Sequence, residues 1–407
     1  MRVLIVHMRY RPDATGTGPL VTALAEGLAS RGEEVTVITS APHYGRQSIP
    51  AQYRGGWLRK HQEAGVDVLR TAAFPWWSGT VVGRAIDYGT YTALGILAVL
   101  RLGRPDVTLA VAPPITVGII GWLIRRFRGA PLVYVAQDIW PDGLVQMGKL
   151  TSPPLISIFR ALERWIYRTA AHVVVVSDGM KRNLQTKGVP PNKVSVIANW
   201  VDLDKVQPVS KENAFRSSHC LSEKFVVLFA GNLGFSSALD TVLRAAQELR
   251  EHPDIVFVIV GEGSAKPGLV SSKEELGLEN VMFLPTQPEK HLSAMMGAAD
   301  ISLVTLRDGM GTLSVPSKTY TIMASGRPIL AAVPADSAVR DLVEESGAGR
   351  VTVAEDPGVL AKAILAMKED IETLEQMGAR GRHYAEAHFG RDMAVQRYHS
   401  LLRDVAK

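Results

Sequence analysis

The strongest constraint on how this chain folds is an alternation of short apolar runs with segments whose apolar residues recur at helical spacing. The runs of the first half are VLIVHM (3–8), VTVITS (35–40), VDVLRT (66–71), VTLAVA (107–112), LVYVAQD (132–138), HVVVVS (172–177) and VSVIAN (194–199). Near-continuous Val, Ile and Leu runs between helices indicate a parallel sheet that is covered on both faces. With right-handed crossovers, the pattern predicts a doubly wound, Rossmann-like domain.

The same alternation starts again after a polar, proline-bearing stretch, WVDLDKVQPVS. Its runs are FVVLFAG (225–231), IVFVIVG (255–261), VMFLP (281–285), ISLVTL (301–306), PILAAV (328–333) and RVTVAE (350–355). We therefore predict an α/β protein of two Rossmann-like domains, residues 1–204 and 205–389, with a ligand cleft at the carboxyl ends of both sheets. The helical tail has a possible break near 388–392, and its last helix, about 390–407, is expected to pack back on the first domain.

The positive charge of the chain is concentrated in its first half. Residues 1–200 hold 23 Lys and Arg against 12 Asp and Glu, whereas acids outnumber bases in the remainder. Such an imbalance favours an anionic partner, either nucleic acid or an acidic lipid surface. No nucleic-acid reading helix or basic-aromatic module is recognisable, so we expect no nucleic acid partner. The single cysteine, Cys220, and an N-terminus without the features of a signal peptide predict a cytoplasmic protein.

Three glycine-bearing loops follow predicted strands, where backbone N–H groups can approach a phosphate. The first loop contains Thr15, Gly16, Thr17 and Gly18, the second Gly231, Asn232 and Gly234, and the third Gly261, Glu262 and Gly263. Each loop alone is equally consistent with an ordinary turn. The second and third loops end successive strands, so together they favour a nucleotide site.

Two ionisable residues stand at positions suited to chemistry. Asp138 follows the apolar run LVYVA and opens the unusual sequence Asp-Ile-Trp-Pro-Asp, although it could instead cap a helix. Lys318 follows Ser317 at a predicted helix start, where the two could bind a phosphate. A lysine beside a helix cap is otherwise most often solvated. We predict catalytic roles for Asp138 and Lys318.

Other signals are negative. Asp202-Leu203-Asp204 has the form of a metal-binding D-x-D motif, but it lies in the predicted hinge and is interpreted as solvated. The histidines and the lone cysteine lack zinc spacing, and neither a P-loop nor a G-x-S-x-G elbow occurs. No metal or cofactor is expected.

Several segments of the chain, in their order along it, resemble the family 4 glycosyltransferases of the GT-B fold. They are the three glycine loops, Asp-Ile-Trp-Pro-Asp, the Asn199-Trp200-Val201-Asp202 hinge, Pro316-Ser317-Lys318 and the 323–328 segment Met-Ala-Ser-Gly-Arg-Pro. The likeness covers nearly the whole chain and is closest to the WbuB-like branch, which is associated with transfer of N-acetylated amino sugars. It implies a retaining, metal-independent enzyme that binds a UDP-sugar in the second domain and an acceptor in the first.

The resemblance also implies roles for individual residues. Asp138 takes the place of the family's active-site His or Asp, and Gly16 and Gly18 would lie beside the donor phosphate or the acceptor. Asn232 and Lys318 would contact the diphosphate, and Glu262 would lie near the base pocket. The chain departs from the family at the cationic pair near Gly231, where it has Asn232 and Ser237, and at two glutamates, replaced by Leu313 and Thr321. Thr321 is nevertheless predicted to bind the donor.

The charge of the first half, together with Trp76-Trp77 in the apolar segment 74–103, predicts peripheral binding to the inner membrane face and a polyprenyl-diphosphate-linked or other glycan acceptor. Residues 118–129, apolar and ending in arginines, are expected to form a core helix. Two other classes of function remain open: a nucleotide-sugar epimerase or hydrolase, and a non-catalytic nucleotide-sugar-binding protein.

Overall fold

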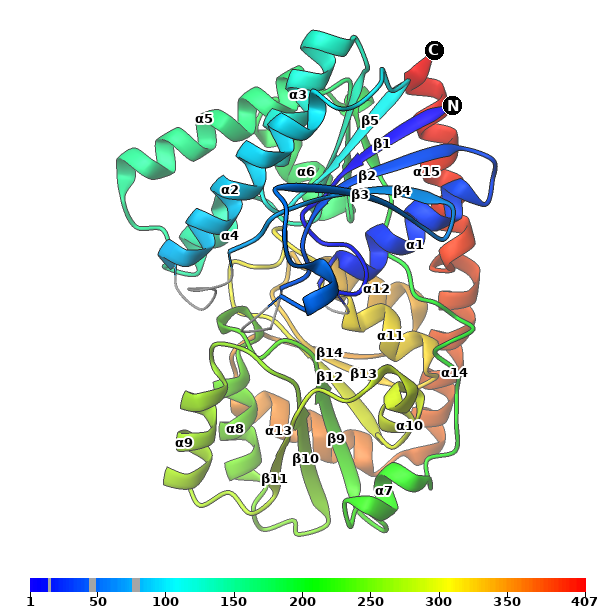
Figure 1. The fold of residues 1–407 in the computed structure, drawn as a ribbon. Helices are drawn as coiled ribbons and strands as arrows, with labels where there is room; N and C mark the ends of the chain where they lie inside the picture. Colours follow the sequence, from blue (N-terminus) through cyan, green and yellow to red (C-terminus); the bar gives the residue numbers. More distant parts are fainter. Residues whose placement is uncertain (14–15, 44–48, 75–80) are drawn as a thin grey trace. The chain divides into compact units, whose positions relative to one another are not determined.

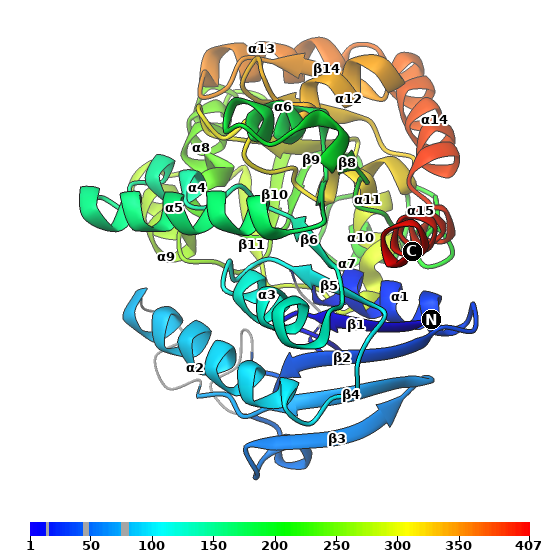
Figure 2. The same ribbon diagram turned by 90° about the horizontal axis from the view of Figure 1, so that it is seen from above.

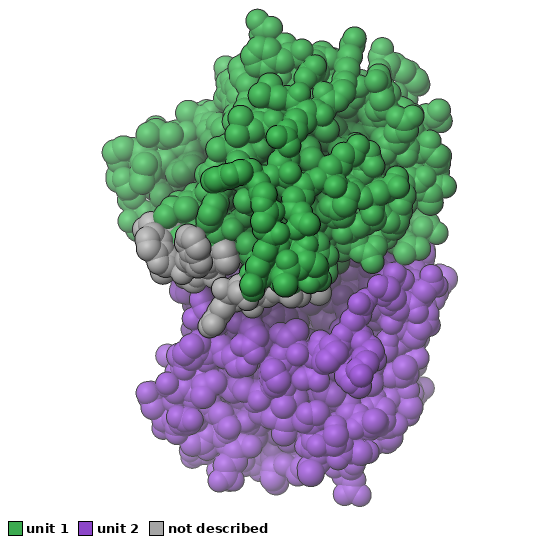
Figure 3. Space-filling view, in the orientation of Figure 1, with its two compact units in different colours: residues 1–198, 391–407 green, residues 199–390 purple. Residues whose placement is uncertain are grey.

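The structure, a computed structural model, describes residues 1–13, 16–43, 49–74 and 81–407. The chain forms two compact units (Figure 3), unit 1 with residues 1–198 and 391–407, and unit 2 with residues 199–390. The predicted boundary at residues 204 and 205 lies a few residues beyond this division. The segment Asn199-Trp200-Val201-Asp202 belongs to unit 2, where Val201 pairs with Gly390 in an isolated parallel bridge.

Unit 1 is built on an eight-stranded sheet with the order β3-β4-β2-β1-β5-β6-β7-β8. Its strands are β1 (Arg2–Val6), β2 (Glu34–Ser40), β3 (Leu58–Glu63), β4 (Val66–Thr71), β5 (Val107–Val111), β6 (Leu132–Ala136), β7 (His172–Val175) and β8 (Val194–Val196). Every predicted run of the first half forms a strand, and these strands pair in parallel.

Strand β3 was not predicted. It is the edge strand of the sheet and pairs antiparallel with β4. Its sequence, LRKHQE, is partly or fully exposed at every position. Charged residues such as these protect an edge strand from pairing with another chain. The apolar pattern that identifies the buried strands is therefore absent from it.

Helices cover both faces of this sheet (Figures 1 and 2). They are α1 (Gly18–Ala29), α2 (Val81–Val99), α3 (Val117–Arg128), α4 (Asp142–Gln146), α5 (Pro153–Thr169), α6 (Asp178–Thr186) and α15 (Arg391–Ala406). Helices α1 and α15 pack together on one face, and α2 and α3 on the other. The contact between α15 and α1 is close, since a methyl group on Gly27 would lie 2.8 Å from the Val395 side chain. The last helix thus packs on the first domain, as predicted.

Unit 2 has a six-stranded, fully parallel sheet with the order β11-β10-β9-β12-β13-β14. Its strands are β9 (Phe225–Ala230), β10 (Ile255–Val260), β11 (Val281–Leu284), β12 (Ile301–Thr305), β13 (Ile329–Ala332) and β14 (Gly349–Thr352). Its helices are α7 (Ala214–Ser218), α8 (Leu239–Glu248), α9 (Lys266–Glu275), α10 (Leu292–Gly297), α11 (Lys318–Ala324), α12 (Ala338–Ser346), α13 (Pro357–Lys368) and α14 (Ile371–His388). The predicted strands of the second half are all present, and the tail breaks between α14 and α15.

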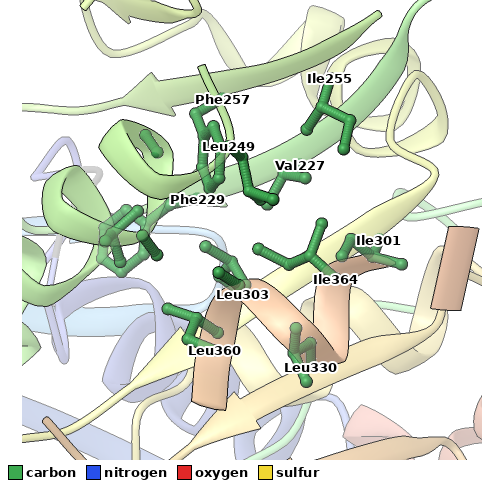
Figure 4. Close-up of a cluster of buried hydrophobic side chains, with 14 of the residues drawn as sticks. Val227, Phe229, Leu249, Ile255, Phe257, Ile301, Leu303, Leu330, Leu360 and Ile364 are labelled. Carbon is green, nitrogen blue, oxygen red and sulfur yellow. The ribbon is translucent and has the colours of Figure 1, made fainter. Parts of the chain in front are cut away.

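The core of unit 2 shows why its strands form here. Alternate residues of β9 and β10, such as Val227, Phe229 and Phe257, point to one face and meet Leu360 and Ile364 of α13 (Figure 4). Burial of such a cluster is the main free-energy gain of the domain, at about 25 cal/mol for each Å² of apolar surface. It also holds the carboxyl ends of β9 and β10 in fixed register. The glycine loops follow directly from these ends.

Candidate active site

The second and third glycine loops of the sequence lie against each other in unit 2. A methyl group on Gly261 would lie 1.9 Å from the carbonyl oxygen of Gly231. Both glycines also have positive φ angles, 151° at Gly231 and 148° at Gly261, which other residues rarely adopt. Glycine is therefore required at both positions, where two strand ends approach at backbone distance.

The same close packing continues one step along each loop. A methyl group on Gly263 would lie 2.3 Å from the carbonyl oxygen of Leu233, whose N–H donates to the Glu262 carbonyl at 2.9 Å. Within the part of the chain that is described, the N–H groups of Asn232 and Gly234 donate to no protein acceptor. They are free to bind an anion at this edge of the sheet.

Lys318 reaches this edge from the first residue of α11. Its Nζ lies 3.2 Å from the centroid of the Phe229 ring, and a methyl group on Gly231 would lie 3.6 Å from that Nζ. The Nζ is buried and has no hydrogen-bond partner among the described residues. Burial lowers the pKa of Lys318 to about 7. The fold thus brings a partnerless amino group to the glycine loops.

The other residues predicted to bind the donor surround this point. Ser317 is exposed and its hydroxyl makes no capping bond, while Thr321 lies one turn after Lys318 and is half-buried. Glu262 is exposed and pairs with Lys266 at 2.7 Å. Leu313, at one of the positions of the family's glutamates, is buried in the core. The Nζ of Lys266 also donates to the Gly261 carbonyl oxygen at 3.2 Å, so the pair of Glu262 and Lys266 lies on the third loop.

In unit 1, Asp138 follows the carboxyl end of β6, as predicted. No described residue donates a hydrogen bond to its carboxylate or forms an ion pair with it. Burial alone raises its pKa to about 6. A carboxyl group with such a pKa can exchange a proton near neutral pH, which is the property expected of a catalytic acid or base.

The second acid of this motif, Asp142, is held quite differently. It pairs with Lys187 at 2.7 Å and with Arg160 at 3.1 Å, and Lys187 also pairs with the buried Glu163 at 2.8 Å. Burial alone would raise the pKa of Asp142, but the hydrogen bonds and charges of Lys187 and Arg160 outweigh it and hold the pKa below its usual value. The network joins α4 to α5 and to the end of α6, and so anchors the segment after Asp138. Sequence reasoning did not predict it.

The first glycine loop precedes α1, and Thr15 lies outside the described residues. Gly16 has a φ of 65°, and Thr17 is the residue before the helix. The Thr17 hydroxyl contacts Nε2 of His7 at 2.8 Å, and Nδ1 of His7 lies 2.8 Å from the Val111 carbonyl oxygen. A carbonyl oxygen only accepts, so Nδ1 carries the hydrogen, and burial lowers the pKa of His7 to about 4. Neutral His7 therefore accepts the Thr17 hydroxyl hydrogen through Nε2.

Sequence reasoning missed His7, although it stands just after a buried strand, as Asp138 does. It also missed His43, which follows β2 and bonds the Ala41 carbonyl oxygen and Asp87, each at 2.7 Å. Both partners accept, so both ring nitrogens of His43 donate. Burial lowers the pKa of His43, but Asp87 outweighs this and the net pKa is raised. A polar residue just beyond a buried strand was the signal available for both histidines.

The segment predicted to dock on a membrane is described only in part, since residues 75–80, including Trp76-Trp77, lie outside the described residues. Beyond them, α2 exposes Leu97, and α3 exposes Phe127 beside Arg125 and Arg126. Helix α3 also buries an apolar face, as expected of residues 118–129. Among the described residues, none of the helices is long and apolar enough to span a bilayer.

Asp202 of the D-x-D sequence accepts hydrogen bonds from the N–H groups of Asp204 and Lys205, at 3.2 Å and 3.3 Å. It therefore shapes the turn in which it lies. Across the described ranges, no three His, Cys, Asp or Glu side chains are grouped as metal ligands would be.

Comparison with known proteins places this geometry in a family. A model of the glycosyl transferase 4-like domain matches residues 15–200, and a model of the glycosyl transferases group 1 matches residues 210–384. The chain belongs to the family 4 glycosyltransferases. The enzyme is 26% identical to the putative colanic acid biosynthesis glycosyl transferase WcaI of Escherichia coli K12, over 99% of this chain and 100% of that protein.

Solved structures of low sequence identity share the fold. Sucrose-phosphate synthase from Thermosynechococcus elongatus superposes with a TM-score of 0.81 at 17% identity, covering 99% of this chain and 98% of that one. Anabaena HepE in complex with UDP-glucose superposes with a TM-score of 0.75 at 17% identity, covering 99% and 100%. These likenesses confirm the predicted GT-B fold of the enzyme.

Proposed function

We propose that the enzyme moves a sugar from a UDP-sugar, an N-acetylated amino sugar as in the WbuB-like branch, to a polyprenyl-diphosphate-linked or other glycan acceptor, with retention of configuration. The observation that carries the proposal is the meeting of the two glycine loops with Lys318 in unit 2. Free N–H groups and a buried amine without a protein partner suit a diphosphate. The HepE complex with UDP-glucose supports a nucleotide-sugar donor, and the name of WcaI supports polysaccharide synthesis.

The chemistry depends on the charges that develop during transfer. Negative charge builds on the leaving diphosphate while the transferred sugar becomes oxocarbenium-like. Lys318 and the N–H groups of Asn232 and Gly234 would stabilise the leaving group without a metal. Asp138, when ionised, would stabilise the cationic sugar or orient the acceptor. The leaving phosphate would take the acceptor's proton, with attack on the same face of the sugar.

A transfer assay with labelled UDP-N-acetylglucosamine tests the reaction. Label should reach the acceptor fraction only when an acceptor is present, whereas a hydrolase or epimerase would consume the donor alone. Lys318→Ala and Asp138→Asn should each lower kcat about 100-fold or more, as loss of one electrostatic stabiliser does in other enzymes. Lys205→Met, in an exposed pair with Glu289, is the control. Near-wild-type turnover in both site variants would contradict these roles.

We also propose peripheral binding of unit 1 to the anionic cytoplasmic face of the membrane. Support comes from α5, which sequence reasoning did not single out. It exposes Leu155 and Ile158, and Arg164 and Arg168 farther along the helix are exposed as well. Helix α5 packs on α3 through Trp165 and Trp122, whose ring centroids lie 5.2 Å apart. Exposed apolar residues next to arginines are typical of interfacial helices.

Sedimentation with vesicles of phosphatidylglycerol and phosphatidylcholine tests this binding. The enzyme should sediment at low salt and dissociate as salt is raised, because charge attraction is screened. The double variant Leu155→Ser, Ile158→Ser should sediment less. Ile371→Ser, at an equally exposed position of unit 2, should behave as wild type. Equal sedimentation of all three proteins would assign the binding to another surface.

A further inference from the structure

Lys318, at the start of α11 beside the glycine loops of unit 2, has a side-chain charge that no partner in the described structure stabilises. Its Nζ is buried, makes no hydrogen bond, and faces the Phe229 ring at 3.2 Å. An ammonium group in such a place loses its hydration, and one aromatic face replaces only part of it. The neutral amine of Lys318 is therefore more favourable, relative to the ammonium form, in this site than it is in water.

The surroundings of Lys318 supply no compensating charge. Strand β9 presents only apolar residues, and the loop of residues 231–237 contains no ionisable side chain. On the third loop, Glu262 is exposed and paired with Lys266, whose Nζ also donates to the Gly261 carbonyl oxygen at 3.2 Å. Beside the second loop, Arg307 donates to the Phe235 carbonyl oxygen and is paired with Asp240 and Glu355. On α11 itself, the ring of Tyr320 packs against Phe389. Burial is accordingly the sole cause of the lowered pKa of Lys318.

We propose that binding of a nucleotide sugar at the glycine loops is coupled to the uptake of a proton by Lys318. This inference rests on the proposed function and adds a regulation of the same site. A diphosphate beside Gly231 would lie within reach of Nζ, and its negative charge favours the ammonium form. The proton comes from solvent, and no bond other than N–H is formed. Donor affinity then depends on pH through one group.

The direction of the pH dependence is set by the two states of Lys318. Without donor the amine titrates at about 7, and with donor it stays protonated to higher pH. Between pH 7 and the higher pKa of Lys318 in the complex, each unit of rising pH weakens donor binding up to about tenfold. At a pH well below 7 the lysine is already charged in both states, so the affinity becomes independent of this group. Phe229 acts as a positioning residue that holds Nζ beside Gly231.

Isothermal titration calorimetry with UDP-N-acetylglucosamine, in buffers of different ionisation enthalpy, measures the protons taken up. The nucleotide sugar is a better probe than UDP, whose terminal phosphate itself titrates near pH 6. We expect about half a proton per bound donor at pH 7 and nearly one at pH 8.5. Lys318→Arg should bind with no proton uptake, because arginine stays charged. Lys205→Met should keep the wild-type uptake.

The outcomes separate the two proposals. Tight binding of UDP-N-acetylglucosamine without proton exchange, in wild type and in Lys318→Arg alike, overturns the coupling and leaves the donor site standing. Proton uptake that persists in Lys318→Arg assigns the proton to another group and also overturns the proposed coupling. If neither UDP-N-acetylglucosamine nor GDP-mannose binds at any pH, the donor proposal fails and the coupling fails with it. In Phe229→Leu the pH of half-maximal uptake should shift, and an unchanged value would contradict the positioning role of the ring.

Discussion

The two units present their strand ends in different ways. In unit 2 the edge consists of backbone: at Gly261 and Gly263 a side chain has no room, and Gly231 has a φ of 151°. Two lysines reach this edge, Lys266 with a bond to the Gly261 carbonyl oxygen and Lys318 without a hydrogen-bond partner among the described residues. In unit 1 the edge consists of side chains, with Asp138 after β6 and His43 after β2. Under the proposed function, the backbone edge would bind the diphosphate of the donor, whereas the side-chain edge could be adapted to a particular acceptor.

Asp138 and Lys318 nevertheless share one property. Asp138 is half-buried and the Nζ of Lys318 is buried, and neither group has a partner in the described structure. The pKa values move toward each other, to about 6 for Asp138 and about 7 for Lys318. Burial disfavours the charged form in both cases. Folding therefore works against both charges, which is typical of groups kept for a ligand or for chemistry. Asp142, by contrast, is paired as a structural ion is.

The largest effect is expected from Gly261→Ala. The new methyl group would lie 1.9 Å from the Gly231 carbonyl oxygen, at a φ of 148°. The free energy of unfolding of unit 2 should fall by more than about 3 kcal/mol, and donor binding should be lost. Gly268→Ala is the matched control, because its helical position in α9 has open space and alanine should be neutral or stabilising there.

Hydrogen exchange of the β9 and β10 amides measures the first change, since a chain of two units need not unfold in one step. If Gly261→Ala protected these amides as well as Gly268→Ala does, the two strand ends would not approach at backbone distance. The contrast between a backbone edge and a side-chain edge would then be lost.

The next largest effect is expected on the pH dependence of stability, where the two acids of the Asp-Ile-Trp-Pro-Asp motif should differ. The folded pKa of Asp138 is about 6, above its unfolded value of about 4. The free energy of unfolding of unit 1 is therefore not reduced by Asp138 below pH 4. It falls by about 3 kcal/mol as the pH rises from 4 to 6, because ionised Asp138 is less favourable in the fold than in water. Asp138→Asn should match wild type at pH 4 and exceed its stability at pH 7.

Asp142→Asn should show the opposite sign. The pKa of Asp142 lies below its usual value, so its pairing stabilises unit 1 above the unfolded pKa and is lost on acidification. Removing the charge should lower the stability at pH 7 by about 1–2 kcal/mol, since the site is only half-buried. Urea unfolding of both variants at the two pH values decides the matter. A loss of stability at pH 7 in Asp138→Asn would mean that its carboxylate has a partner.

Much of this arrangement is predictable from the apolar runs and the residues directly after them. Asp138, Lys318 and the glycine loops stand directly after strands or at a helix start, so local sequence places them at the edges of the sheets. The network of Asp142, Lys187 and Glu163 is not predictable in this way, because it depends on how α4, α5 and α6 pack. The bond of His7 with Val111 likewise joins strands that are neighbours only in the folded sheet.

The smallest effect is expected from Thr17→Val. The hydroxyl of Thr17 donates to Nε2 of His7, so the variant leaves a buried nitrogen without a donor. Unit 1 should lose about 1 kcal/mol of stability, and Thr17→Ser should keep most of it. The change should increase hydrogen exchange in β1 and β5 while leaving β9 as in wild type.

Nitrogen NMR of the histidines provides the sharper readout. Because Nδ1 of His7 donates to the Val111 carbonyl, His7 should keep its hydrogen on Nδ1 in wild type and in Thr17→Val alike, with only the Nε2 shift changing. A hydrogen found on Nε2 in the wild type would reverse the direction of the bond to Thr17. The threonine hydroxyl would then be free to donate to a phosphate, and the first glycine loop would resemble the glycine loops of unit 2 rather than differ from them.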